Sequence, residues 1–222
     1  MRNKLSLIVL TLITLAGTIL RIYDINAIPP GLHYDIAANA ILAEEIAFGD
    51  YKPSFISAYT GKEVLFFYSV ATIYKLIGSS TFALKLTAVF WGTITIPITY
   101  FAIKQILIHK KYVNLIAITT AIMLSFSFTH LIWSRFGLRA ITLPAIQTLS
   151  IGILFRALRL GKTKDFFFTG ILIGLTFHTY LASRVLPIAL IIGFIPMFIT
   201  YFKSYDKTKY TSPHIVNFRK IL

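Results

Sequence analysis

The chain has 222 residues, of which 56% are hydrophobic and 14% charged, and its mean hydropathy is +0.75. Because soluble domains carry about 25% charged residues, this composition excludes an ordinary soluble protein and favours membrane spans. The net charge of +14 does not indicate nucleic-acid binding, since no basic stretch is separate from the apolar segments. Basic residues in cytoplasmic loops, which face anionic lipid, explain this charge instead.

Apolar runs of roughly 17–25 residues are long enough to cross a bilayer. The first such run follows MRNK and is predicted to be an uncleaved signal anchor, because it is long and no small-x-small cleavage site follows it. The sequence predicts six spans in all, at residues 5–23, 82–103, 113–133, 140–160, 166–183 and 185–202. The expected fold is an all-α polytopic membrane protein with one transmembrane domain over residues 1–222.

A seventh apolar run, residues 64–78, is shorter and contains Lys75. If this run does not cross the membrane, 14 of the 22 basic residues lie on the cytoplasmic side, and if it crosses, only 7 do. The positive-inside rule therefore favours a helix that lies in the outer interface. Both termini are then cytoplasmic, with residues 203–222 as a basic tail or the start of a continuation.

The outer segment, residues 24–81, contains six of the eight acidic residues. A Pro-Pro-Gly turn at residues 29–31 ends the first helix. A second helix is expected from about Asp35 to Gly49, with apolar positions every three or four residues that suit a helix resting on the membrane surface. The outer segment thus has two predicted interfacial helices.

Asp35 is the main catalytic candidate. It follows the turn directly and is preceded by His33 and Tyr34. One interpretation is a general base at the boundary between water and membrane. The alternative is a helix N-cap, which Asp provides without any catalytic role.

Basic residues at the outer face are the candidate phosphate ligands. Lys62, followed by Glu63, is a point charge that suits a lipid phosphate, although a snorkelling lysine explains it equally well. Arg135, Arg139 and Arg184 lie in predicted outer loops, against the positive-inside trend. Their guanidinium groups suit phosphate oxygens of a substrate or of bulk lipid.

His178 and Tyr180 end the fifth predicted span near Arg184, where a structural role and a catalytic role both remain open for the histidine. The chain contains no Walker loop, no Gly-x-Gly-x-x-Gly motif, no serine nucleophile elbow and no cluster with metal-ligand spacing. We therefore predict neither a cofactor nor a metal site.

With these residues in place, the chain resembles the GT-C class of membrane glycosyltransferases, nearest to glycosyltransferase family 39 with the protein O-mannosyltransferase and aminoarabinose transferase relatives. Each motif is loose, but four in the right order are fairly specific. They are PPGLHYDIAANAILAEEIAFGDY, YTGKEVLFFYSVATIYKLIGSSTFALKL, WSRFGLRA and GLTFHTYLASRVLP.

The resemblance implies transfer of a sugar from a polyprenyl-phosphate-linked donor to an acceptor hydroxyl of a glycan, lipid or protein. Asp35 matches the general base of this class, and Lys62 matches a basic residue near the lipid phosphate. An inverting displacement is implied. The expected location is a prokaryotic cytoplasmic membrane with the active site facing outward.

The chain departs from the class in three ways. Ile36 follows Asp35 where many members have Glu, and Arg139 or Ala140 stands where many have an acidic residue in the second outer loop. Members also usually continue beyond six spans, so the chain is interpreted either as complete or as an N-terminal fragment. A non-enzymatic lipid-phosphate-binding or transport protein is the alternative function.

Overall fold

The computed structural model describes residues 3–58 and 61–208, and between 197 and 208 it describes side chains only at Ile199. Apart from an antiparallel bridge between Ile56 and Lys62, the regular elements in these ranges are helices. Their bounds are α1 Asn3–Ile22, α2 Tyr34–Phe48, α3 Leu65–Ile77, α4 Thr81–Ile106, α5 Val113–Phe126, α6 Phe128–Phe136, η1 Arg139–Ile141, α7 Thr142–Leu160, α8 Thr163–Thr176, η2 Leu181–Arg184 and α9 Val185–Thr208.

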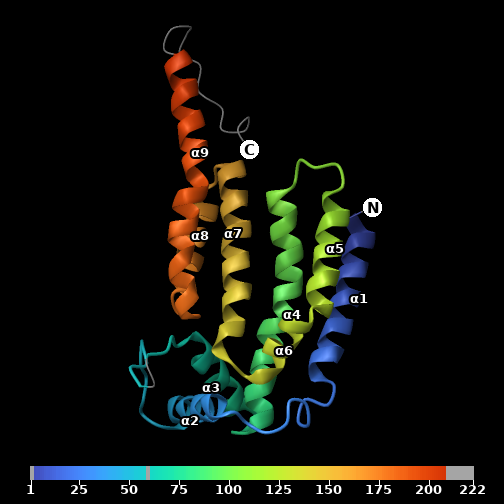
Figure 1. The fold of residues 1–222 in the computed structure, drawn as a ribbon, viewed down its shortest axis with the longest axis vertical. Coiled ribbons are helices and arrows are strands. Elements are labelled where there is room, and N and C mark those ends of the chain that lie inside the picture. The colour runs from blue at the N-terminus through green and yellow to red at the C-terminus, as the bar shows by residue number, and fades with distance from the viewer. Residues whose placement is uncertain (1–2, 59–60, 209–222) are drawn as a thin grey trace.

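The long helices run side by side, and α2 lies across one end of them (Figure 1). α4 is central, because it packs against α1, α5, α6 and α7, and α7 also packs against α8. The predicted outer segment and the loops near residues 137–141 lie at the same end, whereas the loops at 107–112 and 161–162 lie at the other (Figure 1). The helices thus separate the loops into two sets.

The number of spans is only partly as expected. In the described part of the chain, three helices are long and apolar enough to cross a membrane, at Lys4–Ile22, Thr81–Ile106 and Arg139–Leu160. α5 and α6 add a fourth if they form one broken span, bent by 56°. α8 has only 14 residues, about 21 Å at 1.5 Å per residue, which is shorter than the hydrocarbon core. The six predicted spans are therefore not confirmed.

Both predicted helices of the outer segment are present, but they do not use their apolar faces as expected. Ile36, Ala43 and Ala47 of α2 pack in one buried cluster with Phe66 and Phe67 of α3. The prediction that this face of α2 rests on the membrane is wrong for these side chains, because they bury their apolar surface against other residues of the protein. The cluster fixes α2 and α3 as one unit beneath the end of α4.

Capping explains where several helices begin and end. The Ser80 side chain accepts from the Ala83 N–H at 3.1 Å and starts α4, as expected for an N-cap serine. Gly137, with φ of 75°, ends α6 in the left-handed conformation that glycine adopts without strain. The chain then turns through η1 into α7, which brings the residues after Gly137 over α3.

Candidate functional site

A cavity of about 310 Å³ opens where α2, the end of α6, η1 and the 177–184 loop meet. It contains two cations, one carboxylate and one amide, which is enough polar chemistry to orient a ligand headgroup, and its size suits a small-molecule site. We call it the polar cavity. Its lining residues are Asp35, Asn39, Lys62, Trp133, Leu138, Arg139, Ala140 and Tyr180.

Asp35 lies in the first turn of α2, and its side chain is 53% exposed. It is not the helix cap, because the helix begins at Tyr34 and the His33 ring accepts from the Asp35 N–H at 3.4 Å. The capping interpretation of the sequence was therefore wrong, and Asp35 is one of the residues that line the cavity. The His33 Nδ1 lies 3.8 Å from one Asp35 oxygen.

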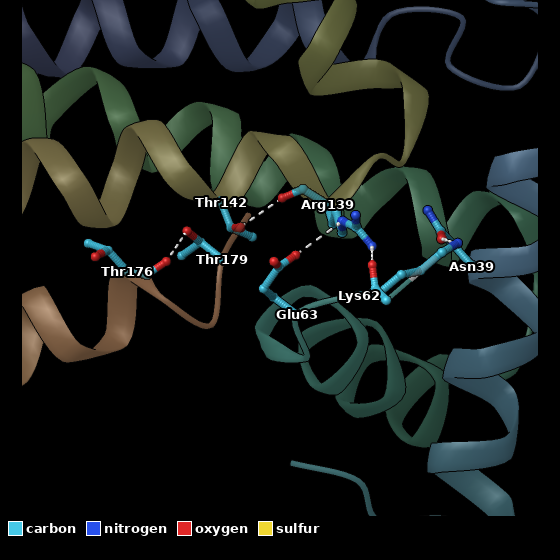
Figure 2. Close-up of polar contacts among 8 residues, drawn as sticks. Asn39, Lys62, Glu63, Arg139, Thr142, Thr176 and Thr179 are labelled. Atoms are coloured by element: carbon cyan, nitrogen blue, oxygen red, sulfur yellow. Dashed lines mark hydrogen bonds and ion pairs between the residues drawn. The ribbon is translucent and has the colours of Figure 1, made fainter. Parts of the chain in front are cut away.

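Lys62 is held by both its backbone and its side chain. Its N–H donates to the Ile56 carbonyl at 2.7 Å and its carbonyl accepts from the Ile56 N–H at 3.0 Å. Its ammonium donates to Asn39 Oδ1 at 2.8 Å (Figure 2). Burial lowers the pKa of Lys62, the positive charge of Arg139 lowers it further, and the Asp35 carboxylate raises it. Asp35 and Lys62 both line the polar cavity.

Arg139 follows the turn at Gly137, and three neighbouring residues contact its side chain. Its Nε lies 3.5 Å from a carboxylate oxygen of buried Glu63, and Figure 2 shows this pair between α3 and the start of α7. Its Nη1 donates to the Gly61 carbonyl at 3.5 Å, and its guanidinium carbon lies 5.5 Å from the Tyr180 ring centroid. Glu63 does not line the polar cavity, and its ion pair positions the Arg139 side chain from outside it.

The structure does not bring the other candidate residues into the polar cavity. Arg135 is buried and does not line the polar cavity. Its guanidinium group donates to the carbonyls of Leu20 and Tyr23 at the end of α1. Arg184 and His178 are exposed, and the His178 carbonyl accepts from the Leu65 N–H at 3.0 Å. Tyr34 is also exposed, at 74%.

Asn39 and Trp133 also line the polar cavity, and the sequence patterns did not single them out. Asn39 is four residues after Asp35, so the two share a face of α2, and an amide in an otherwise apolar stretch was a usable signal. Trp133 carried no such signal, because an aromatic residue near a helix end is typical of any membrane protein. Among the described residues, no group of three or more His, Cys, Asp and Glu side chains is placed to hold a metal ion.

Comparison with known proteins supplies the family. The family model described as dolichyl-phosphate-mannose-protein mannosyltransferase matches residues 62–214. No curated protein and no solved structure matches the chain. The matched range begins at Lys62 and includes Glu63, Arg139 and Tyr180, whereas Asp35 and Asn39 precede it. Because the match covers more than half of the sequence, the chain belongs to the dolichyl-phosphate-mannose-protein mannosyltransferase family and is a membrane glycosyltransferase of the GT-C type.

Proposed function

We propose that the protein transfers a sugar from a polyprenyl-phosphate-linked donor to an acceptor hydroxyl, with Asp35 as the general base. The observation that carries this proposal is the shared cavity of Asp35, Lys62 and Arg139. A base and two phosphate-compatible cations face the same space, which is the arrangement that this reaction needs.

The reaction is a single displacement. The acceptor hydroxyl attacks the anomeric carbon while Asp35 takes its proton, and the bond between that carbon and the phosphate oxygen breaks. Polyprenyl phosphate leaves, and Lys62 and Arg139 stabilise the charge that develops on it. One displacement inverts the anomeric configuration. These side chains meet the charge of the phosphate without a cofactor in the proposed step.

A second cavity, of about 350 Å³, supports a lipid-linked donor. It shares Trp133, Ala140 and Tyr180 with the polar cavity, and its other lining residues include Ile141 and Pro144. A headgroup in the polar cavity would thus have an apolar space next to it. We call this second space the apolar cavity.

Sugar transfer by the Asp35→Asn variant tests the proposal. The assay uses the purified chain in proteoliposomes with a polyprenyl-phosphate mannose donor and, in separate reactions, a glycan, a lipid or a peptide that offers an acceptor hydroxyl, and it measures release of polyprenyl phosphate together with mannose on the acceptor. Loss of the base should slow transfer by about 100-fold or more. Glu45→Gln, an exposed acid on the same helix, is the matched control and should transfer normally.

Two results would contradict the assignment. Transfer by Asp35→Asn within a few-fold of the wild type would exclude Asp35 as the base. Binding of the lipid phosphate without transfer by the wild-type chain would favour the alternative of a lipid-phosphate-binding or transport protein.

We propose further that the polar cavity faces the non-cytoplasmic side of a prokaryotic cytoplasmic membrane. The charge distribution supports this orientation, since basic residues concentrate in the loops at the opposite end. The chain has no cysteine, so single cysteines at exposed Ser57 and exposed Lys111 give clean labelling sites. A membrane-impermeant thiol reagent should label position 57 from outside and position 111 only after lysis. The reverse pattern would overturn the orientation.

A further inference from the structure

Asn39 is a buried amide beside Lys62. The residue is only 3% exposed, and it lines the polar cavity together with Asp35, one helical turn before it on α2. A buried amide still needs hydrogen-bond partners, because burial without them is costly. The Asn39 side chain has such a partner in the ammonium group of Lys62.

The contact with Lys62 fixes the orientation of the amide. A lysine ammonium has three N–H donors and no acceptor. The Asn39 atom that lies 2.8 Å from Lys62 Nζ must therefore be the carbonyl oxygen Oδ1. Because both residues are buried, competing water weakens this hydrogen bond less than it would at the surface.

A buried aromatic ring lies near the same ammonium. Lys62 Nζ is 6.0 Å from the centroid of the Phe67 ring, at the limit of a cation–π contact. Phe67 is fully buried in the cluster that joins α2 and α3. Asn39 on α2 and Phe67 on α3 thus approach the ammonium from two packed helices, and neither group carries a charge.

Arg139, the other cation of the polar cavity, has a charged partner instead. Its Nε lies 3.5 Å from a carboxylate oxygen of Glu63. A carboxylate offsets part of the positive charge of its partner, whereas an amide oxygen accepts a hydrogen bond and leaves the net charge unchanged. The Asn39 contact therefore orients Lys62 without neutralising it.

We propose that Asn39 is a positioning residue, whose uncharged amide oxygen holds the Lys62 ammonium at the polar cavity and leaves its positive charge to the phosphate of the donor. The proposal rests on the proposed function, in which Lys62 stabilises the leaving phosphate. Asn39 acts through Lys62 and does not need to touch the substrate. An aspartate of the same shape would pair with the ammonium and repel the phosphate.

Binding of a lipid phosphate to the chain and its variants tests this role. Trp133 lines the polar cavity, and the chain has two tryptophans, so Trp91→Phe leaves Trp133 as the single reporter. In nanodiscs, a polyprenyl phosphate with a nitroxide near its phosphate should quench Trp133 when it binds. Titration then gives the affinity of each variant in this background.

Asn39→Ala removes the acceptor and should weaken binding by about 10-fold. The double variant with Lys62→Ala should bind no more weakly than Lys62→Ala alone, because the effect of Asn39 passes through the ammonium. A general disturbance of α2 would instead add to the loss from Lys62→Ala. Asn26→Ala, which changes an exposed amide between α1 and α2, is the matched control and should bind as the wild type does.

Asn39→Asp keeps the shape of the side chain and tests the charge alone. At neutral pH it should weaken binding by about 10-fold or more. A carboxylate at this position also raises the pKa of Lys62, so the loss of affinity at alkaline pH should move to higher pH. The other ionisable residues of the cavity, Asp35, Arg139 and Tyr180, and the Glu63 that pairs with Arg139, are the same in both chains.

The outcomes are separable. Additive losses in the double variant would overturn the proposal. Wild-type affinity and an unchanged pH profile in Asn39→Asp would also overturn it, even if Asn39→Ala failed to fold. If Asp35→Asn retained transfer while the losses at Asn39 and Lys62 were not additive, the proposed function would fail and this inference would stand. Loss of transfer in Asp35→Asn together with additive losses at Asn39 and Lys62 would have the opposite meaning.

Discussion

Two pairs of cations lie at the same end of the helices and have different neighbours. Lys85 and Arg135, which we call the carbonyl clamp, bind main-chain oxygens at the end of α1 and in the turn after it. Lys62 and Arg139, the cavity cations, face the polar cavity and contact side chains of Asn39 and Glu63. Burial alone does not distinguish them, since Lys62 and Arg135 are 6% and 9% exposed.

The two pairs of cations differ in whether they can also bind a ligand. Helix carbonyls at the end of α1 have no other partner within the helix. The carbonyl clamp therefore supplies their hydrogen bonds whether or not a ligand is present. A cation that lines an open cavity can bind an anion from outside the protein. Arg139 also donates to a main-chain carbonyl, that of Gly61, so the feature that separates it from Arg135 is its place in the wall of the polar cavity.

Arg135→Ala should have the largest effect on stability. Arg135 makes four hydrogen bonds of 2.6–3.2 Å to the carbonyls of Leu20, Tyr23 and Ile28. Their loss leaves buried carbonyls unpaired and should lower the free energy of unfolding by about 3 kcal/mol. Thermal unfolding in detergent measures this effect, and exposed Arg184→Ala is the control. Unchanged stability would show that the hydrogen bonds of Arg135 to these carbonyls do not stabilise the fold.

Lys62→Ala should affect binding and not stability. Removing a charged donor from the site should weaken binding of the polyprenyl phosphate by about 2 kcal/mol, roughly 30-fold. The free energy of unfolding should change little, since the buried ammonium carries a desolvation cost of its own. Quenching of Trp133 by a polyprenyl phosphate that carries a nitroxide measures the affinity, in a Trp91→Phe background that leaves Trp133 as the single tryptophan. Exposed Lys75→Ala is the control. A large loss of stability with unchanged affinity would show that Lys62 stabilises the fold, as the carbonyl clamp does, and does not bind the donor.

Glu63→Gln should have a smaller effect, because Glu63 acts through Arg139. The ion pair with Arg139 Nε at 3.5 Å is buried on the glutamate side. Its loss should weaken donor binding by about 1 kcal/mol, roughly 5-fold. Glu44→Gln, on the exposed face of α2, is the control. A double variant with Arg139→Ala should be no weaker than Arg139→Ala alone; additive losses would show that Glu63 does not act through the arginine.

The pH dependence should be the weakest effect. The folded protein holds Lys62 with a pKa below its ordinary value of 10.5, so the unfolded chain binds this proton more tightly. The Lys62 contribution to the free energy of unfolding is therefore least favourable below the folded pKa and improves as pH rises from there toward 10.5. Donor affinity should fall over the same range, as the cation is lost. Affinity measured against pH checks this, and Lys62→Arg should move the decline to higher pH.

The helical class and the position of the Asp35 turn were predictable from local patterns. Run length and hydropathy identify long apolar helices because each helix satisfies its own backbone. The span count was less predictable, since α8 is apolar and yet only 14 residues long, and its end depends on the turn that leads into η2. Asp35, Lys62, Arg139 and Tyr180, which the sequence patterns indicated, line one cavity, and their roles stay predictions. The family match supports the GT-C relationship.

The separation of Arg135 from Arg139 could not be read from the sequence. Both lie in the stretch WSRFGLRA, four residues apart, and either suits a phosphate. The turn at Gly137 sends the first toward α1 and the second toward Glu63. The partnership of Asn39 with Lys62, 23 residues apart, and that of Arg21 with His130, 109 residues apart, were hidden for the same reason.

Local patterns were enough to predict a helical, apolar protein with one acidic segment, because hydropathy and turn chemistry act over a few neighbouring residues. Which of the cations line the polar cavity was set by the tertiary fold. That choice depends on contacts between residues distant in the chain, where packing sets the direction of each side chain and local pattern carries no information about it.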